Sequence, residues 1–289
     1  MTLKHIKGTF RIVGASPDGD SVRFYPYNPD AFRVLNLLVR TNAHGGAQLR
    51  LDAIDALETH YTPRGGHVPW HQPRALGEAA SSSLLEYLGF TNVERDERGT
   101  VVRATPEQVP GYILTRFADK YGRAVSFAFR GSRRRTADLV DVYLDAEGLR
   151  ASANWQQLRA GMAYPTYYSK LFPDLREELS ATVTEARSEG LGIWAEDVTT
   201  TGFRLTSRQQ LTDDLVIMPK LFRRLAEYLE LDTSGGASLD RFASFLETSD
   251  DRLFTIPDGH ATSFDTLVHV RRQRLRLITL PEHIVFLEK

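Results

Sequence analysis

Residues 50 to 58 read RLDAIDALE, a stretch that combines a strand pattern with charged side chains where the strand would end. The alternation of polar and apolar residues over 48–54 predicts a β-strand with one buried face. Arg50, Asp55 and Glu58 supply one guanidinium and two carboxylates at this strand and just beyond it. Because Arg50 and Asp55 are five positions apart, they point to opposite faces of a straight strand. They converge only if a bend or a bulge intervenes.

Three other short segments contain the remaining residues suited to chemistry. They are Asp18-Gly19-Asp20, Asp119-Lys120-Tyr121-Gly122-Arg123 and Gly190-Leu191-Gly192-Ile193-Trp194. Carboxylate oxygens bind hard divalent cations, and a pair of guanidinium groups stabilises the charge on a phosphoryl group under attack. Alone, an Asp-Gly-Asp triplet is more typical of a solvated turn. Together, the segments predict a metal-dependent reaction at a phosphodiester.

The composition is that of an ordinary globular protein, with 42% hydrophobic and 25% charged residues among 289. The chain has no cysteine, which excludes disulfides and thiolate metal ligands. No apolar run reaches the roughly 18 residues of a membrane span, and residues 1–14 lack the apolar core of a signal peptide. We therefore expect a cytoplasmic protein without a membrane partner. A net charge of −1 means that any attraction for nucleic acid must be local.

The order of predicted elements is typical of an α+β protein built around a small closed β-barrel. Strands are predicted over 9–13, 21–25, 34–40, 48–54, 112–117, 124–130 and 139–144, and helices over 76–88, 154–162 and 174–190. Residues 1–201 are predicted to form this domain. Residues 202–289 read as helix, helix, strand and strand, and are predicted to form a small C-terminal α+β accessory domain. No motif in that domain indicates a function.

Four motifs, in order along the chain, resemble the staphylococcal nuclease (thermonuclease) family. They are Asp18-Gly19-Asp20-Ser21-Val22, the 50–58 stretch, Asp119-Lys120-Tyr121-Gly122-Arg123, and Glu185-Ala186-Arg187 continuing to Trp194. The resemblance covers residues 7 to 198. It implies a five-stranded OB-fold β-barrel with helices and a Ca²⁺-dependent endonuclease that cleaves DNA and RNA by metal-assisted in-line attack of water.

The resemblance also implies roles for individual residues. Asp20, Asp55 and the backbone carbonyl of Ala56 would bind Ca²⁺, which Mg²⁺ or Mn²⁺ could replace. Glu58 would orient or activate water. Arg50 and Arg123 would bind the phosphate, and Lys120 and Tyr121 would lie along the nucleotide. Leu57 stands where the family usually has proline, which loosens the loop that places Glu58.

Further nucleic-acid contacts are predicted from residue type. Three tyrosines could stack on bases, namely Tyr164, Tyr167 and Tyr168, and Tyr167 is the predicted contact. Tyrosines at the surface or the barrel edge explain them as well. The stretch 120–135 has no acidic residue and ends with Arg133, Arg134 and Arg135. These three arginines are predicted to lie at a hairpin tip and to guide a nucleic-acid strand into the cleft. A solvated loop is the alternative for these arginines.

One rival function remains open beside the nuclease. An OB-type barrel that kept its shape and lost catalysis would bind nucleic acid or a protein partner. The C-terminal domain could likewise recruit a protein partner. The presence of all the predicted metal ligands, the base and both arginines favours the enzyme. Preference for DNA or RNA is left open.

Overall fold

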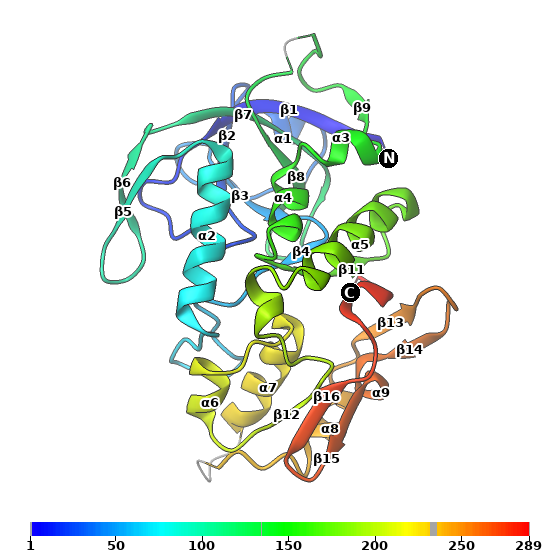
Figure 1. Ribbon diagram of the computed structural model, residues 1–289. Coiled ribbons are helices and arrows are strands. Elements are labelled where there is room, and N and C mark those ends of the chain that lie inside the picture. The colour runs from blue at the N-terminus through cyan, green and yellow to red at the C-terminus, as the bar shows by residue number, and fades with distance from the viewer. Residues whose placement is uncertain (1, 134, 232–235, 289) are drawn as a thin grey trace.

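The computed structural model describes residues 2–133, 135–231 and 236–288, and it contains both helices and sheets. Figure 1 shows the strands of the N-terminal region at the top and the C-terminal segment below them. No helix within the described ranges is long and apolar enough to cross a bilayer.

Five strands close into a β-barrel. Their order is β1-β2-β3-β8-β7, with β7 returning to β1, and each neighbouring pair is antiparallel except β3 and β8, which run parallel. The bounds are Thr2–Phe10 (β1), Arg23–Pro26 (β2), Ala47–Leu51 (β3), Val109–Ala118 (β7) and Ala124–Arg130 (β8). The predicted α+β class and closed barrel are confirmed, and the arrangement is that of an OB-like barrel.

Two glycines allow the barrel to close tightly. Gly8 of β1 lies opposite Gly111 of β7 in the ladder. A Cβ at Gly8 would lie 2.2 Å from the carbonyl oxygen of Tyr25, and one at Gly111 would lie 2.6 Å from that of Phe129. The backbones therefore approach more closely than side chains would permit. Phe10, Phe24 and Phe127 are among the fully buried side chains of the core.

Helices and a hairpin surround the barrel. They are α1 (Ala31–Val34), α2 (Arg74–Leu88), α3 (Ala146–Leu149), α4 (Ala153–Arg159), α5 (Pro173–Ser188), η1 (Gly192–Ala195), β5 (Asn92–Arg95) and β6 (Val101–Thr105), with β9 (Asp141–Tyr143) pairing to the outside of β1. The helices predicted over 76–88, 154–162 and 174–190 correspond to α2, α4 and α5. Gly89 and Gly190 follow two of them at positive φ, as helix-terminating glycines do.

The strand predicted over 34–40 is wrong. Residues 31–34 form α1, and the chain then turns at Asn36, whose φ is +54°. Leu38 is 89% exposed, so this apolar residue is not part of a buried strand face. The β5–β6 hairpin was not predicted. No residue of β5 is fully buried, and β6 buries only Val101 and Ala104, so neither strand has the regular alternation of buried and exposed residues that marks a strand.

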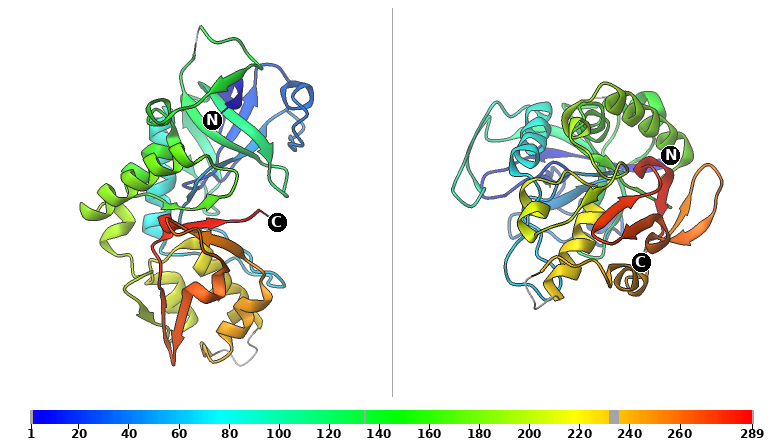
Figure 2. Two further views of the ribbon diagram at one scale, coloured as in Figure 1. Left: turned by 90° about the vertical axis from the view of Figure 1, so that its right-hand side faces the viewer. Right: turned by 60° about the horizontal axis from the view of Figure 1, so that its bottom comes forward.

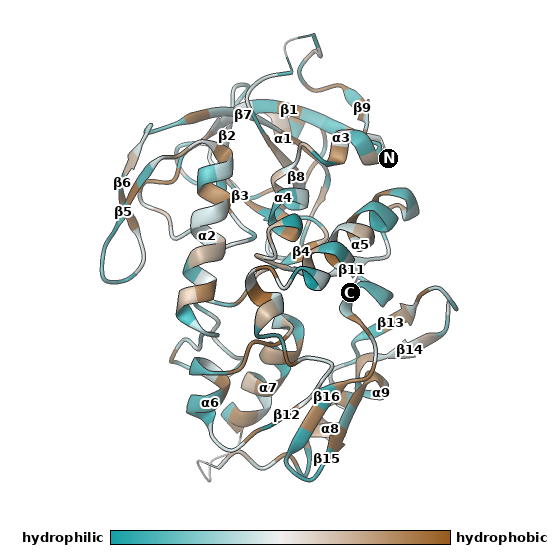
Figure 3. Ribbon diagram, viewed as in Figure 1, coloured by the Kyte–Doolittle hydropathy of each residue, from teal (hydrophilic) through white to brown (hydrophobic). Residues whose placement is uncertain are grey.

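The C-terminal segment is a mixture of short helices and strands. They are β12 (Phe203–Arg204), α6 (Arg208–Asp213), α7 (Pro219–Leu231), α8 (Phe242–Thr248), β13 (Arg252–Thr255), β14 (Ala261–Ser263), α9 (Phe264–Leu267), β15 (Val268–Arg271), β16 (Arg274–Leu277), η2 (Pro281–His283) and β17 (Ile284–Phe286). Figure 3 shows apolar and polar residues interspersed along these elements. The apolar residues Leu221, Phe222, Leu225 and Leu229 of α7 are buried.

The C-terminal segment packs directly against the N-terminal region, as both views of Figure 2 show. Strand β17 pairs in parallel with β11 (Tyr167–Tyr168), which follows β10 (Tyr164–Pro165). The Arg187 guanidinium donates to both carboxylate oxygens of Glu282. The buried apolar residues form one continuous cluster that includes both regions. The predicted boundary after residue 201 stays a prediction.

Candidate active site

A sharp bend brings Arg50 and Asp55 together. Strand β3 ends at Leu51, residues 52 and 53 form a turn, and β4 (Ile54–Asp55) then pairs with β10. Ala53 lies at the turn with φ +68°, a conformation that reverses the side-chain alternation of a straight strand. As a result the Arg50 Nη2 donates to Asp55 Oδ1 at 2.9 Å and to the Ile54 carbonyl oxygen at 3.1 Å. The bend on which the predicted site depended is present.

Asp20 joins this cluster from the loop before β2. Its Oδ2 accepts the backbone N–H of Ala56 at 3.0 Å and also pairs with Arg50 Nη1. Gly19 is packed so closely that a Cβ would lie 2.6 Å from the side chains of both Ala56 and Ala80. Glycine at this position therefore lets the Asp20 loop lie against the 55–58 loop.

The structure adds one residue that sequence reasoning missed, Arg223 on α7. Its Nη2 lies 2.6 Å from Asp55 Oδ2, its Nη1 lies 3.1 Å from Asp55 Oδ1, and Nη1 also donates to Glu58 Oε1. Arg223 is 168 residues from Asp55 in sequence, and no motif surrounds it. The only available signal was its place on the polar side of an amphipathic helix, which is typical of many surface helices.

Burial and ion pairing act in opposite directions on these carboxyl groups. Asp55 is 1% exposed, and burial alone would raise its pKa, but Arg223 and Arg50 hold that pKa well below its usual range. Burial raises the pKa of Glu58, and Arg223 offsets this only in part. Burial alone would lower the pKa of the Arg223 guanidinium. Asp55 and Glu58 outweigh this effect and raise the pKa above its usual value. Asp55 is therefore a firmly ionised anion between two cations.

The arrangement does not fit the predicted calcium ion. Ca²⁺ requires six to eight oxygen ligands around one point. Both Asp55 oxygens, Asp20 Oδ2 and Glu58 Oε1 accept from arginine nitrogens instead. Among the described residues no group of three or more His, Asp or Glu side chains is arranged to hold a metal. Each of the three carboxylates is thus paired with a protein guanidinium in this conformation.

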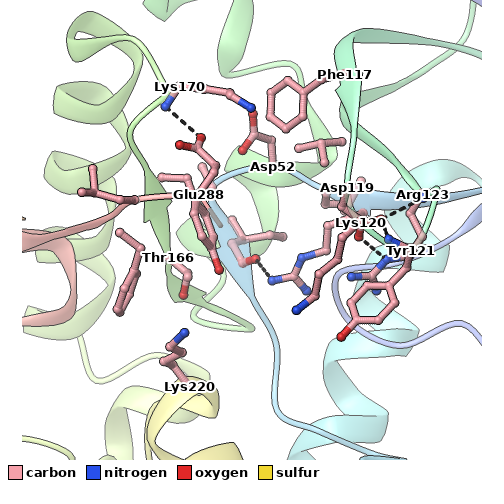
Figure 4. A pocket seen from close by; sticks show the side chains of 18 of the residues that line it. Asp52, Phe117, Asp119, Lys120, Tyr121, Arg123, Thr166, Lys170, Lys220 and Glu288 are labelled. Carbon is pink, nitrogen blue, oxygen red and sulfur yellow. Dashed lines mark hydrogen bonds and ion pairs between the residues drawn. The ribbon is translucent and has the colours of Figure 1, made fainter. Parts of the chain in front are cut away.

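A cavity of about 290 Å³ lies beside the cluster (Figure 4). Arg50 and Arg123 both line it, although they come from β3 and from the turn between β7 and β8. Asp119 orients Arg123, since its Oδ2 accepts from Arg123 Nε at 2.7 Å. Lys120 and Tyr121 line the same side, and Tyr121 is 61% exposed. Four of the residues predicted to contact substrate therefore lie around one cavity. The lining does not include Asp20, Asp55 or Glu58.

The C-terminal segment forms the opposite wall of this cavity. The lining there includes Lys220 and Arg224 of α7, Asp251 and Phe286. Asp251 binds both cations, at 2.9 Å from Lys220 and 2.6 Å from Arg224 Nε. Burial lowers the pKa of Lys220 to about 8, even beside Asp251. Seven basic and four acidic side chains line the whole cavity, so its lining is positively charged.

One polar group in the cavity wall has no protein partner. Thr166 is 2% exposed, and its Oγ1 forms no hydrogen bond with any described residue. Thr166 lies between Lys220 and Glu288 in the close view (Figure 4). A buried hydroxyl is normally hydrogen-bonded, so this one is available to a ligand or a water molecule.

Two predicted contacts with nucleic acid are corrected by the structure. Tyr167 is fully buried, with its hydroxyl 3.0 Å from Ser180 Oγ, so its ring is not available to stack on a base. Its neighbour Tyr168 lines the cavity instead. Strand alternation explains the difference, because adjacent residues of β11 face opposite sides.

The predicted arginine guide lies at the wrong end of the barrel. Arg133 and Arg135 are exposed in the segment that follows β8, while Arg134 lies outside the described residues. Arg123 precedes β8 and Arg130 ends it, so these ends are about 20 Å apart at 3.3 Å per residue. Figure 1 shows the segment after β8 on the side away from the C-terminal segment. These arginines do not lead into the cavity.

Asp52 should make stability depend on pH. It lines the cavity at 9% exposure, and burial raises its pKa to about 6. The folded protein therefore binds more protons than the unfolded chain between about pH 4 and 6, so stability falls as pH rises through this window. Asp52→Asn should be more stable than wild type at pH 7.5 by about 1 to 3 kcal/mol, with little difference at pH 4. Urea unfolding at the two pH values measures this. An equal difference at both would show that Asp52 is not the titrating group.

Comparison with known proteins does not assign the chain. No protein-family model matches it, and no curated protein matches it. The resemblance to the staphylococcal nuclease family therefore stays a prediction that depends on the four sequence motifs.

Proposed function

We propose that this protein is a nuclease, a phosphodiesterase that acts on DNA or RNA. The observation that carries the proposal is the placement of Arg50 and Arg123 around one positively charged cavity. Two guanidinium groups from separate elements can bind the non-bridging oxygens of one phosphate from two sides. Asp119 holds Arg123 in place before any substrate binds, which lowers the cost of positioning it.

The cavity favours a single strand over a duplex. Its volume of about 290 Å³ is near the lower end for sites that enclose small organic ligands, which suits one nucleotide unit. Tyr121 and Tyr168 add aromatic surface to the basic lining. Stacking on aromatic rings together with phosphate contacts is how single strands are bound without sequence preference. The OB-like barrel is consistent with this mode.

The proposed reaction is in-line attack of water on phosphorus. The water oxygen bonds to phosphorus as the bond to the leaving oxygen breaks, Glu58 accepts the proton of the water, and the leaving oxygen is protonated by solvent. Arg50 and Arg123 stabilise the charge on the phosphoryl oxygens. The raised pKa of Glu58 suits a proton acceptor. Glu58 must first exchange its ion pair with Arg223 for contact with the substrate.

A second candidate function is nucleic-acid binding without hydrolysis. The contacts of Arg223 favour it, because Asp55 and Glu58 are both engaged by a protein cation. The phosphate-facing arginines of the cavity are retained in this case. The two candidates differ only in whether bound strands are cut.

Replacing Arg123 by alanine is the test of the proposal. Arg123→Ala should lower the cleavage rate of a single-stranded oligonucleotide about 100-fold, because it removes transition-state charge stabilisation. Arg130→Ala is the matched control, since it removes an arginine from the other end of β8 and should change the rate by less than about twofold. Cleavage should be followed by gel electrophoresis with Ca²⁺, Mg²⁺, Mn²⁺ or a chelator.

Three outcomes distinguish the candidates. A large loss in Arg123→Ala alone supports the nuclease. Tight binding by wild type without cleavage under any of these conditions supports the binding protein. Equal loss in both variants would show that general positive charge, and not the placement of Arg123 in this cavity, supports cleavage.

A further inference from the structure

Helix α7 presents a polar face to the candidate active site. Lys220, Arg223, Glu227 and Glu230 recur at intervals of three and four residues, so they lie on one side of the helix. The other side, which includes Leu221, Phe222, Leu225 and Leu229, is buried in the core. The helix is thus fixed by its apolar side while its charged side contacts the barrel.

Two hydrogen bonds hold this polar face against the loop that follows Glu58. The Tyr61 hydroxyl donates to Glu227 at 2.7 Å, and the Trp70 indole N–H donates to Glu230 at 3.2 Å. Both aromatic residues belong to the long loop that follows Glu58. Arg223 lies one turn before Glu227 and is thereby placed against Asp55 and Glu58. Its position results from the docking of the whole helix.

Arg223 contacts carboxylate oxygens that a metal ion would need as ligands. It pairs with both oxygens of Asp55 and with one oxygen of Glu58. Counted with Arg50, two guanidinium groups oppose the three carboxylates of Asp20, Asp55 and Glu58. A divalent cation at these oxygens would meet two positive charges at close range and would have no free pair of Asp55 oxygens.

We propose that Arg223 and a divalent cation compete for Asp55 and Glu58, so that the docked helix α7 keeps metal out of the site. The C-terminal segment is then an intramolecular inhibitor of metal binding. This inference does not depend on the proposed hydrolytic activity, because metal binding by itself tests it. A protein that binds nucleic acid without cutting it would show the same competition.

Calorimetric titration of the full chain with Ca²⁺ tests the competition. Arg223→Gln should bind Ca²⁺ about tenfold or more tightly than wild type, because the substitution frees Asp55 and Glu58. Arg224→Gln is the matched control, since it removes the same charge from the next position of α7, where the partners are Asp251 and Glu227. Its affinity should stay within about twofold of wild type. Equal Ca²⁺ affinity in wild type and Arg223→Gln would overturn the proposal, and so would an equal gain in Arg224→Gln.

Arg223→Lys separates charge from side-chain shape. The ammonium keeps the positive charge, so this variant should bind Ca²⁺ as weakly as wild type, and tight binding would contradict competition by charge. If Arg223→Gln does not fold without metal, circular dichroism during a Ca²⁺ titration replaces calorimetry. Folding driven by Ca²⁺ then supports the proposal, because a ligand that binds only the folded state stabilises it. The absence of any response overturns it.

Discussion

Glu58→Gln is expected to bind single-stranded oligonucleotide as wild type does but to cut it about 10² to 10⁴ times more slowly. The amide has the size of the carboxylate but cannot accept a proton from water. Nucleic-acid binding should persist because Glu58 lies outside the described cavity lining, whereas Arg50 and Arg123 belong to it. Single-turnover cleavage and fluorescence anisotropy measure the two quantities separately.

Glu189→Gln is the matched control for this variant. Glu189 pairs with Arg159 at the surface, 3.0 Å between Oε2 and Nη1, and its side chain is 48% exposed. Its replacement should leave the cleavage rate unchanged. Loss of binding in Glu58→Gln would indicate that the carboxylate shapes the cavity. An unchanged rate would exclude Glu58 as the base while leaving the phosphate contacts intact.

Asp55→Asn is expected to lower the free energy of unfolding by about 3 to 5 kcal/mol. Asp55 is almost fully buried and accepts from both Arg50 and Arg223. An amide cannot balance two guanidinium charges, so the substitution leaves buried cations without sufficient counter-charge. Urea unfolding at neutral pH measures the loss. Two spectroscopic probes should give the same transition if unfolding is two-state.

A surface aspartate supplies the comparison. Asp141 pairs with Lys4 at 2.8 Å, with its side chain 56% exposed, so Asp141→Asn should cost less than about 1 kcal/mol. Combining Asp55→Asn with Arg223→Gln should cost less than the sum of the two single changes, because the pair is removed together. Strict additivity would show that the observed ion pair contributes no coupling. A loss below 1 kcal/mol in Asp55→Asn would show that the cluster is well solvated.

Local patterns in the sequence predicted most of the barrel and four of the residues that line the cavity. The alternation over 112–117 and 124–130 falls within β7 and β8 because each strand has a face in the core. Arg50 and Asp55 were expected to meet only through a bend, and Ala53 provides it at φ +68°. Such inferences succeed where neighbouring residues determine the conformation. The strand predicted over 34–40 failed because none of its apolar residues is fully buried.

Long-range packing determined which partners the predicted residues have. Tyr167 and Tyr168 are adjacent, and only the pairing of β11 with β17 determines which of them faces the cavity. The arginines after β8 are near Arg123 in sequence but are separated from it by the length of a strand. Sequence proximity is a poor guide to spatial proximity in extended structure, since each residue adds about 3.3 Å.

The sequence by itself determined that this protein has a small β-barrel and carries two arginines and three carboxylates in motifs suited to phosphodiester chemistry. Only the tertiary structure decided that Asp55 and Glu58 face Arg223, a cation 168 residues after Asp55 in the sequence, in place of an open metal site. The physical reason lies in how charges are buried. Residue type gives Asp55 its negative charge, but the packing of α7 decides which cation is close enough to balance that charge.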